Sequence, residues 1–362
     1  MYMNKTDRSS RLVATWLLIG VGMTIIQIAL GGITRLTGSG LSITQWDVIT
    51  GSLPPLNQQQ WMGEFDKYRH TPQFQLLNFD FTLSDFKFIF FWEWFHRLWA
   101  RTIGLVFIIG FIWLLVKKHF KKEMINPLLI LFLLGAMQGA IGWIMVASGL
   151  TGDAVYVKPT RLALHFIFAL GLLCYCFWFA LKLLVKKEEL VNSPSLRKWN
   201  ITILCLLVVQ LLYGALMAGH KAATVAPTWP TINGQWLPDN LMTEHPLVLN
   251  FIDNKVLIHF VHRGIAYILL LLILLWSVAL SKKQGSGLFS KTRWAPLIIV
   301  IAQALLGIGS VLLSTGIVPG HWGAFEWMAQ LHQLIGMLLL LSLVWTLFLV
   351  RGHTQKSSVQ IQ

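Results

Sequence analysis

Four histidines lie inside long apolar segments, where an ionisable side chain is costly and is usually retained for a function. They form two pairs with nearly the same separation, 69 residues from His96 to His165 and 70 residues from His262 to His332. Each pair begins with a His-Arg dipeptide and ends with a Leu-His dipeptide. Because an imidazole nitrogen is a common metal ligand, the pattern predicts two equivalent sites, each formed by histidines from two different segments.

The number of ligands distinguishes between metals. Zinc normally takes three or four protein ligands, and no cysteine or carboxylate recurs in both halves of the chain to complete such a set. A haem iron needs only one or two axial imidazoles, and its apolar macrocycle suits a bundle immersed in lipid. The sequence therefore favours two haem sites in which all four histidines are axial iron ligands.

Glu93 distinguishes the first pair from the second. It lies three residues before His96 and on the same helical face, whereas the corresponding position before His262 is His259. A carboxylate in this setting can accept a proton or stabilise positive charge beside a haem, and it can equally form a salt bridge with Arg97 or Arg101. The first interpretation makes the first pair a reacting site and the second pair the site of a permanent haem.

Two arginines directly follow histidines, Arg97 after His96 and Arg263 after His262. A guanidinium at this place can bind a haem propionate bidentately, or it can extend to the lipid headgroups. The sequence leaves these two roles open. Arg97 and Arg263 are therefore candidate cofactor-binding residues.

The composition places these residues in a membrane protein. Of the 362 residues, 55% are hydrophobic and 12% are charged, against about 25% charged in an average soluble domain. The net charge of +14 arises mostly between long apolar runs, which indicates membrane topology and not nucleic-acid binding. Apolar runs of about 20 residues predict eight transmembrane helices. They lie near residues 12–33, 87–116, 127–148, 161–185, 200–219, 255–280, 294–314 and 328–350.

An internal duplication organises the eight segments. The first, third, fifth and seventh spans each contain Gln-x-x-x-Gly, and in the first and fifth a tryptophan and a glycine follow at identical intervals. The matching positions are Gln27 with Gln210, Gly31 with Gly214, Trp46 with Trp229, Gly51 with Gly234, Gln138 with Gln303 and Gly142 with Gly307. The predicted fold is an all-α membrane protein with two tandem four-helix bundles. Residues 1–190 would hold the reacting haem and a long outward loop, and residues 191–362 the permanent haem.

The distribution of basic residues predicts the orientation in the membrane. The N-terminus, the second, fourth and sixth loops and the C-terminus carry 18 of the 29 lysines and arginines, and the other loops carry 8. By the positive-inside rule both termini are cytoplasmic, the long loops 34–86 and 220–254 face outward, and the haem sites lie toward the outer face. The first apolar segment has no cleavage signal, which favours a retained helix in a bacterial inner membrane.

Four stretches are more specific than the histidines alone: residues 31–42, 49–55, 61–65 and 86–97. In these stretches, and over essentially all eight spans, the chain resembles the haem A synthase family in its proteobacterial and mitochondrial subgroup. The resemblance implies that a ring methyl of haem O is oxidised to a formyl group by successive hydroxylation and loss of water. It also implies that His96 and His165 are axial to the substrate haem, that Glu93 is the catalytic carboxylate, and that His262 and His332 hold a resident haem b.

The family also implies partners. A haem O synthase would supply the substrate, and a haem-copper oxidase would receive the product, although no motif here is typical of a docking site for either. Membrane lipid surrounds the helices, no nucleic acid is expected, and the sequence leaves the choice between monomer and homo-oligomer open. Some family members carry a cysteine pair in an outward loop, whereas Cys174, Cys176 and Cys205 all lie in apolar runs of this chain.

Two other functions would use the same four histidines. One is a di-haem b electron-transfer protein, such as a quinol oxidoreductase, but such a protein places its haems near both membrane faces, whereas these histidines share one depth. The other is a haem carrier that performs no chemistry. The asymmetric placement of Glu93 argues against a carrier.

Overall fold

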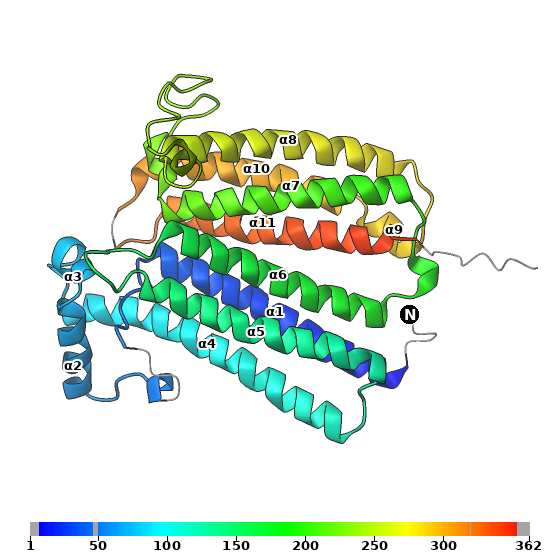
Figure 1. Cartoon of the computed structure of the whole chain (residues 1–362), viewed down its shortest axis with the longest axis horizontal. Helices are drawn as coiled ribbons and strands as arrows, with labels where there is room; N and C mark the ends of the chain where they lie inside the picture. Colours follow the sequence, from blue (N-terminus) through cyan, green and yellow to red (C-terminus); the bar gives the residue numbers. More distant parts are fainter. Residues whose placement is uncertain (1–6, 46–49, 319, 353–362) are drawn as a thin grey trace, which may run out of the picture.

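Long α-helices run side by side through the molecule, with short connections at one end and long loops at the other (Figure 1). The structure is a computed structural model that describes residues 7–45, 50–318 and 320–352, and these residues contain no β-strand. Within them, eight helical spans are long and apolar enough to cross a membrane, which confirms the predicted number. They are α1 (Arg8–Leu36), α4 (Leu83–Val116), α5 (Lys122–Ala147), α6 (Pro159–Leu184), α7 (Pro194–Gly219), α8 (Lys255–Ser281), α9 (Gly287–Thr292) continued by α10 (Ala295–Leu312), and α11 (Ala324–Leu349).

The helix starts differ from the predicted spans because polar capping groups extend the helices beyond their apolar segments. α4 begins at Leu83 and not at residue 87, since Thr82 and Asp85 form a capping box in which Asp85 Oδ2 accepts from the Thr82 backbone N–H at 2.8 Å. α1 begins at Arg8 and not at residue 12, since Asp7 accepts from the Ser10 backbone N–H at 2.8 Å. Hydropathy does not detect these polar first turns.

The helices form two four-helix bundles that follow the two halves of the sequence. In the first bundle α1 packs against α4 and α6, and α5 packs against α6. In the second bundle α7 packs against α8, α10 against α11, and α8 against α10. Contacts of α6 with α7 and of α1 with α11 join the bundles (Figure 1). The tandem four-helix architecture predicted from the duplication is therefore confirmed.

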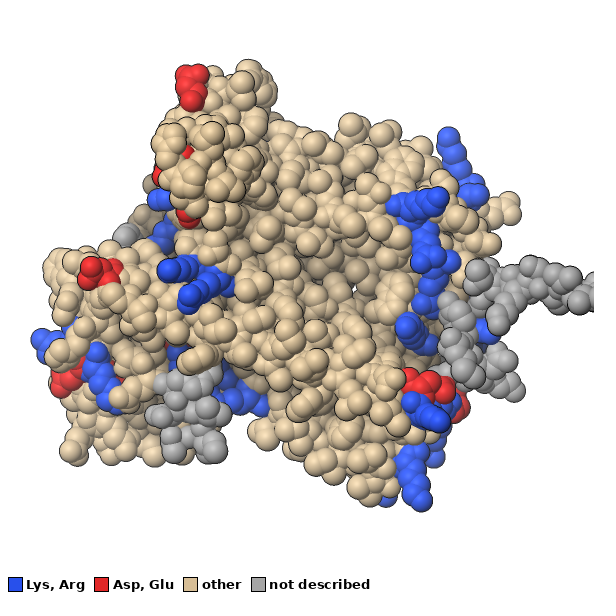
Figure 2. Space-filling view, in the orientation of Figure 1, with Lys and Arg blue, Asp and Glu red and all other residues tan. Residues whose placement is uncertain are grey.

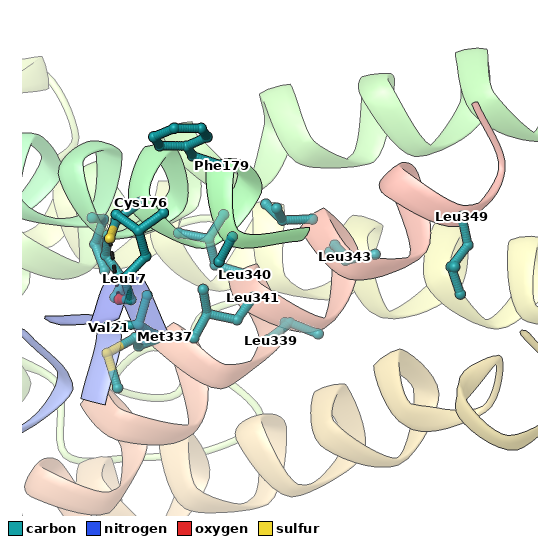
Figure 3. Close-up of a cluster of buried hydrophobic side chains, with 14 of the residues drawn as sticks. Leu17, Val21, Cys176, Phe179, Met337, Leu339, Leu340, Leu341, Leu343 and Leu349 are labelled. Atoms are coloured by element: carbon teal, nitrogen blue, oxygen red, sulfur yellow. Dashed lines mark hydrogen bonds between the residues drawn. The ribbon is translucent and has the colours of Figure 1, made fainter. Parts of the chain in front are cut away.

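The hydrophobic core lies where the two bundles meet. Leu17 of α1, Cys176 of α6 and Met337 of α11 are buried together in one cluster (Figure 3). The Cys176 thiol donates a hydrogen bond to the Leu17 carbonyl oxygen at 3.4 Å, which agrees with a packing role for this cysteine. Because α1, α6 and α11 share this core, the bundles are fixed relative to each other by apolar burial.

The first long loop folds onto the N-terminal end of α4. It contains α2 (Gln58–Arg69) and α3 (Pro72–Leu77), and Phe65 and Tyr68 of α2 pack on Phe86 of α4. The buried Tyr68 hydroxyl donates to Gln73 Oε1 at 3.0 Å and accepts from Asn78 at 2.7 Å. Burial raises the pKa of Tyr68 to about 12. This loop therefore has its own small core and forms a folded cover over the first bundle.

Charge is unevenly distributed between the two ends of the molecule. Figure 2 shows a band made mostly of Lys and Arg side chains, with a few acidic ones among them, at the end that carries the short connections. The opposite end carries the long loops, and both acidic and basic side chains appear there. The band coincides with the loops that the sequence assigns to the cytoplasm.

Candidate functional site

All four predicted histidines line one cavity of about 1890 Å³ that is bordered by both bundles. Pockets for drug-sized ligands enclose roughly 300–1,000 Å³, so this cavity has room for more than one large ligand. His165, His262 and His332 lie six to eight residues after the start of their helices, as expected. His96 lies 13 residues after the start of α4, farther from the helix start than predicted, because the capping box lengthens that helix at its N-terminal end.

The imidazole rings of the second histidine pair lie close to each other. The ring centroids of His262 and His332 are 6.3 Å apart, and the ring planes are inclined by 76°. Two imidazoles on opposite sides of a metal, with metal–nitrogen bonds of about 2 Å, need ring centroids about 6 Å apart. His262 comes from α8 and His332 from α11, two helices of the second bundle. The separation of the two rings therefore fits two imidazoles that would hold one haem iron.

Each histidine ring lies directly against a glycine of a neighbouring helix in its own bundle. A Cβ added to the glycine would lie 3.2 Å from the ring Cε1 on α1 and α7, and 2.8 Å from it on α5 and α10. The contacts join Gly31 to His96, Gly142 to His165, Gly214 to His262 and Gly307 to His332. The glycines thus provide the space that the imidazoles occupy, and the contact distances are the same in both halves.

Four glutamines, one helical turn before these glycines, approach the same rings. The amide Nε2 lies 3.1 to 3.4 Å from the histidine Nε2 in every case. The pairs are Gln27 with His96, Gln138 with His165, Gln210 with His262 and Gln303 with His332. In the first bundle both amides also donate to the backbone carbonyl oxygen of their histidine, at 3.2 Å. All four amide oxygens are buried and have no hydrogen-bond partner among the described residues.

Glu93 is buried at the wall of the cavity, with 2% of its surface exposed. Its Oε2 accepts from the backbone N–H and the hydroxyl of Ser42, both at 2.7 Å, and from the backbone N–H of Ile43 at 2.9 Å. Its Oε1 pairs with Nη2 of Arg97 at 2.5 Å. The salt bridge that the sequence offered as an alternative is therefore present, and Glu93 also fastens the turn after α1 onto α4. Arg97 points inward and lines the same cavity.

The second bundle has an arrangement that matches the contacts of Glu93 and Arg97 but uses different residues. We call each of these two arrangements a clamp. Arg263 donates to the fully buried His259 through Nε at 3.0 Å, which corresponds to the pairing of Arg97 with Glu93. The same guanidinium donates to the carbonyl oxygens of Ala226, Thr228 and Thr231 at 2.7 to 3.1 Å. Both clamps hold the segment that follows the first helix of the bundle. In the first clamp the arginine pairs with a carboxylate, and in the second it pairs with an imidazole.

The two bundles also differ in how far they are closed. α8 packs along α10, whereas α4 makes its main helix contact with α1, and no comparable packing with α5 occurs in the described part of the chain. On the cavity side of this gap Gly104 and Gly135 are exposed. The equivalent positions of the second bundle hold Leu270, which is half-buried, and Val300, which is buried. The first half of the cavity is thus open between α4 and α5, and larger side chains fill the equivalent gap in the second.

A model of the cytochrome oxidase assembly protein family (COX15-CtaA) matches residues 14–344, nearly the whole chain. The chain belongs to this family. The match runs from within α1 to within α11, and hence contains both histidine pairs and both clamps.

Curated relatives of this cytochrome oxidase assembly family member are bacterial proteins named heme A synthase. One from Methylobacterium radiotolerans is 40% identical over 92% of this chain and 89% of its own length. Another from Flavobacterium psychrophilum is 39% identical over 94% of this chain and 98% of its own length. A third, from Rhodospirillum centenum, is 40% identical over 96% of this chain and 90% of its own length.

The structure brings the predicted residues together at one cavity and adds others. His96, His165, His262, His332 and Glu93 all line it, as do Arg97 and Arg263. Neither arginine extends outward as a surface side chain, since each is engaged in a clamp. The sequence analysis used Gln-x-x-x-Gly only as a sign of duplication and missed its contact with the histidines. The four-residue spacing, which places both side chains on one helical face, was the available signal. Trp46 lies outside the described residues.

Proposed function

We propose that this protein is a haem A synthase, an oxidoreductase that converts one ring methyl of haem O into a formyl group by successive hydroxylation. The observation that carries this proposal is the presence of two histidine pairs at one cavity, in a chain about 40% identical to relatives named heme A synthase. Conversion of a methyl to a formyl group with one oxygen from water releases four electrons and four protons. The reaction therefore needs an external electron acceptor.

His96 and His165 would hold the substrate haem, and His262 and His332 would hold a resident haem b. The difference in closure supports this division, because a substrate must enter and leave while a cofactor stays bound. The gap between α4 and α5, bordered by Gly104 and Gly135, offers an apolar substrate a lateral route from the lipid. When bound, haem b supplies a one-electron redox centre close to the substrate site.

Glu93 would act as the catalytic carboxylate, and its contacts suggest how. In the structure its charge is neutralised by Arg97. A haem propionate is a second anion that a guanidinium binds bidentately. We infer that Arg97 turns toward a propionate when the substrate binds, which leaves Glu93 Oε1 available to stabilise positive charge at the ring methyl or to accept a proton from water. Ser42 and Ile43 keep the other oxygen in place during this exchange.

The protein would lie in the bacterial inner membrane with both termini in the cytoplasm and both haem sites toward the outer face. The Lys and Arg band at the end with the short connections supports this orientation. The clamps and the outer loops then cover the cavity from outside. Supply of haem O by a haem O synthase, and use of haem A by a haem-copper oxidase, would follow from the reaction.

Extraction of haems from the membranes of a host that makes haem O tests the proposal. With this protein expressed, chromatography should reveal haem A or its hydroxymethyl precursor, and both should be absent without it. If purified protein carries haem b while haem O stays unconverted, the proposal fails in favour of electron transfer or haem transport. The Ser42→Ala variant keeps Glu93 but removes one of its hydrogen bonds, so it is the matched control for the Glu93→Gln variant.

A further inference from the structure

The two bundles meet at two helix contacts that the duplication relates to each other. α6, the last helix of the first bundle, packs on α7, and α11, the last helix of the second bundle, packs on α1. The contact of α6 with α7 is apolar, and Ala163 and Ala215 are buried there in one cluster. At the corresponding positions α11 and α1 carry Gln330 and Gly32. The two junctions are therefore equivalent in place but differ in chemistry.

The junction of α1 with α11 is polar. The Gln330 amide donates to the carbonyl oxygen of Ala29 at 3.0 Å, and the Gln333 amide donates to that of Ile28 at 2.9 Å. Gly32 leaves room for both amides, because an added Cβ would clash with each of them. Gly32 and Gln333 also line the cavity, so this polar junction forms part of the cavity wall.

Arg35 lies in the last turn of α1 and lines the same cavity. It continues the row of Gln27 and Gly31, which are four residues apart and contact His96. The Arg35 side chain is partly buried, and its Nε has no hydrogen-bond partner. Its guanidinium forms no salt bridge with any of the described residues. Because a guanidinium keeps its charge, placing it at this depth is costly until an anion pairs with it.

Glu326 of α11 does not supply that anion by direct contact. Its charge acts on Arg35, but its carboxylate is held elsewhere. Glu326 is buried, and its Oε2 accepts from the backbone N–H of Gly323 at 2.8 Å, at the start of α11. Trp322 precedes this glycine and carries a second buried donor, Nε1, that has no partner in the described part of the chain. This wall of the cavity therefore offers donors to an acceptor that the described residues do not provide.

We propose that Arg35 binds a propionate carboxylate of the porphyrin held by His96 and His165. A guanidinium binds a carboxylate bidentately, and haem O carries two propionates. The proposed function assigns one of them to Arg97, on α4. Arg35 binds the other from the side of α1. This inference rests on the proposed function for the identity of the porphyrin, and it adds the residue that recognises the second carboxylate.

The second bundle lacks this guanidinium. Arg263 corresponds to Arg97, but the position equivalent to Arg35 is Ala218. Pro159 of α6 occupies the position of Glu326 and packs directly against Gly219 of α7. Two guanidiniums at one end of the first bundle hold the carboxylate edge of a porphyrin that binds anew in each reaction cycle. A permanent haem is oriented only once, and the second bundle has an apolar contact at the equivalent place.

Porphyrin titration of the protein that carries its resident haem b tests the proposal by affinity and not by activity. The protein is titrated anaerobically with haem O or with the dimethyl ester of haem O, without an electron acceptor, and the Soret difference spectrum reports binding. The wild type should bind haem O at least about tenfold more tightly than the ester, because the ester loses the charge-assisted hydrogen bonds. His96→Ala should abolish binding of both porphyrins, which assigns the signal to the first site.

Substitutions of Arg35 isolate its share of this preference. Arg35→Gln should weaken binding of haem O by about tenfold and change binding of the ester less than twofold. Arg35→Lys keeps the charge but not the planar fork, so it should lose less than Arg35→Gln. Arg161→Gln is the matched control, because Arg161 is exposed and donates to the carbonyl oxygen of Ile144 at 3.1 Å. It should change both affinities less than about twofold.

Retention of the resident haem b verifies that each variant is folded, and the comparison of haem O with its ester in the wild type needs no variant. The proposal is overturned if the wild type binds both porphyrins equally, or if Arg35→Gln weakens the ester as much as haem O. It is also overturned if native mass spectrometry shows that Arg35→Gln loses a bound phospholipid while its affinity for haem O is unchanged. The anion at Arg35 is then a lipid phosphate.

The same titration distinguishes failure of this inference from failure of the proposed function. If the wild type binds neither porphyrin, the proposed function fails and this inference fails with it. If Arg35→Gln binds haem O as tightly as the wild type does, only this inference fails.

Discussion

The two bundles share one plan for holding imidazoles, and they differ in what surrounds them. In both, a glutamine and a glycine one turn apart receive a histidine from a neighbouring helix, and the distances from glycine to histidine are the same in the two bundles. The first bundle adds a buried carboxylate, Glu93, where the second has His259, and it is open between α4 and α5 where the second is closed. Duplication preserved the contacts that receive the imidazoles, while the clamp and the helix gap diverged. We interpret the first site as reactive and exchangeable and the second as permanent.

The carboxylate is the difference with the largest expected effect. Glu93→Gln should lower haem A formation by about 10²-fold or more, because the amide keeps the size of the side chain but neither accepts a proton nor carries a charge. Haem chromatography of membranes measures the product, and the haem b content of the purified protein should stay near that of the wild type. Ser42→Ala, which removes one hydrogen bond to the same carboxylate, should cost far less. Equal losses in both variants would mean that Glu93 acts only as a clamp.

Loss of an axial ligand should separate the two sites. His332→Ala should reduce the haem b content of purified protein at least about tenfold, because the resident haem loses one of its two imidazoles. His165→Ala makes the same change in the first bundle and should leave haem b in place while it abolishes conversion of haem O. Haem content per polypeptide, from the pyridine haemochrome spectrum, is the measurement. Unchanged haem b in His332→Ala would reverse the assignment of the halves.

The open side of the first bundle can be closed with the residues of the second. The double variant Gly104→Leu and Gly135→Val should lower haem O conversion by roughly tenfold, because the added side chains overfill the gap between α4 and α5. Haem b content should not change, since Leu270 and Val300 already occupy the equivalent positions beside the second site. Conversion rates are measured at several haem O concentrations. An unaltered rate in the double variant would show that substrate enters elsewhere.

A small effect on stability is expected from the ion pair that joins the start of α1 to the connection between α4 and α5. Asp7 forms a salt bridge with Lys121, in the loop between α4 and α5, at 2.7 Å. The hydrogen bond from Lys121, followed by those from Ser10, lowers the pKa of Asp7 from 3.8 to about 2. Since the folded pKa lies below the unfolded one, the contribution is complete above about pH 4 and is lost as the pH falls toward 2.

Asp7→Asn should therefore reduce stability by about 0.5 kcal/mol at pH 7, the magnitude of an exposed ion pair, and by less at pH 3. Thermal unfolding in detergent at the two pH values measures the difference. Asp66→Asn, which breaks an exposed pair with Arg69 within α2, is the control. If Asp7→Asn loses more stability at pH 3 than at pH 7, the ion pair with Lys121 is not the source of the stabilisation.

Parts of the site were predictable from sequence because their signals are local. The capped, apolar helices and the repeated spacing of His96 and His165 against His262 and His332 place four imidazoles at one level of two bundles. Glu93 stood out because its counterpart, His259, is chemically different. The roles of Arg97 and Arg263 were not decided, because each arginine has partners both on its own helix and in a loop of undetermined path.

The eight spans, the duplication and the four histidines follow from the chain alone, because hydrophobic run length, spacing and residue type are properties of the linear sequence. The folded arrangement was needed to show which glutamine contacts which histidine, that Glu93 pairs with Arg97 while it holds the turn at Ser42, and that α4 stands apart from α5. These features join residues that are far apart in sequence or depend on how two helices pack. Helix packing angles and gaps arise from the whole set of contacts, and no single segment encodes them.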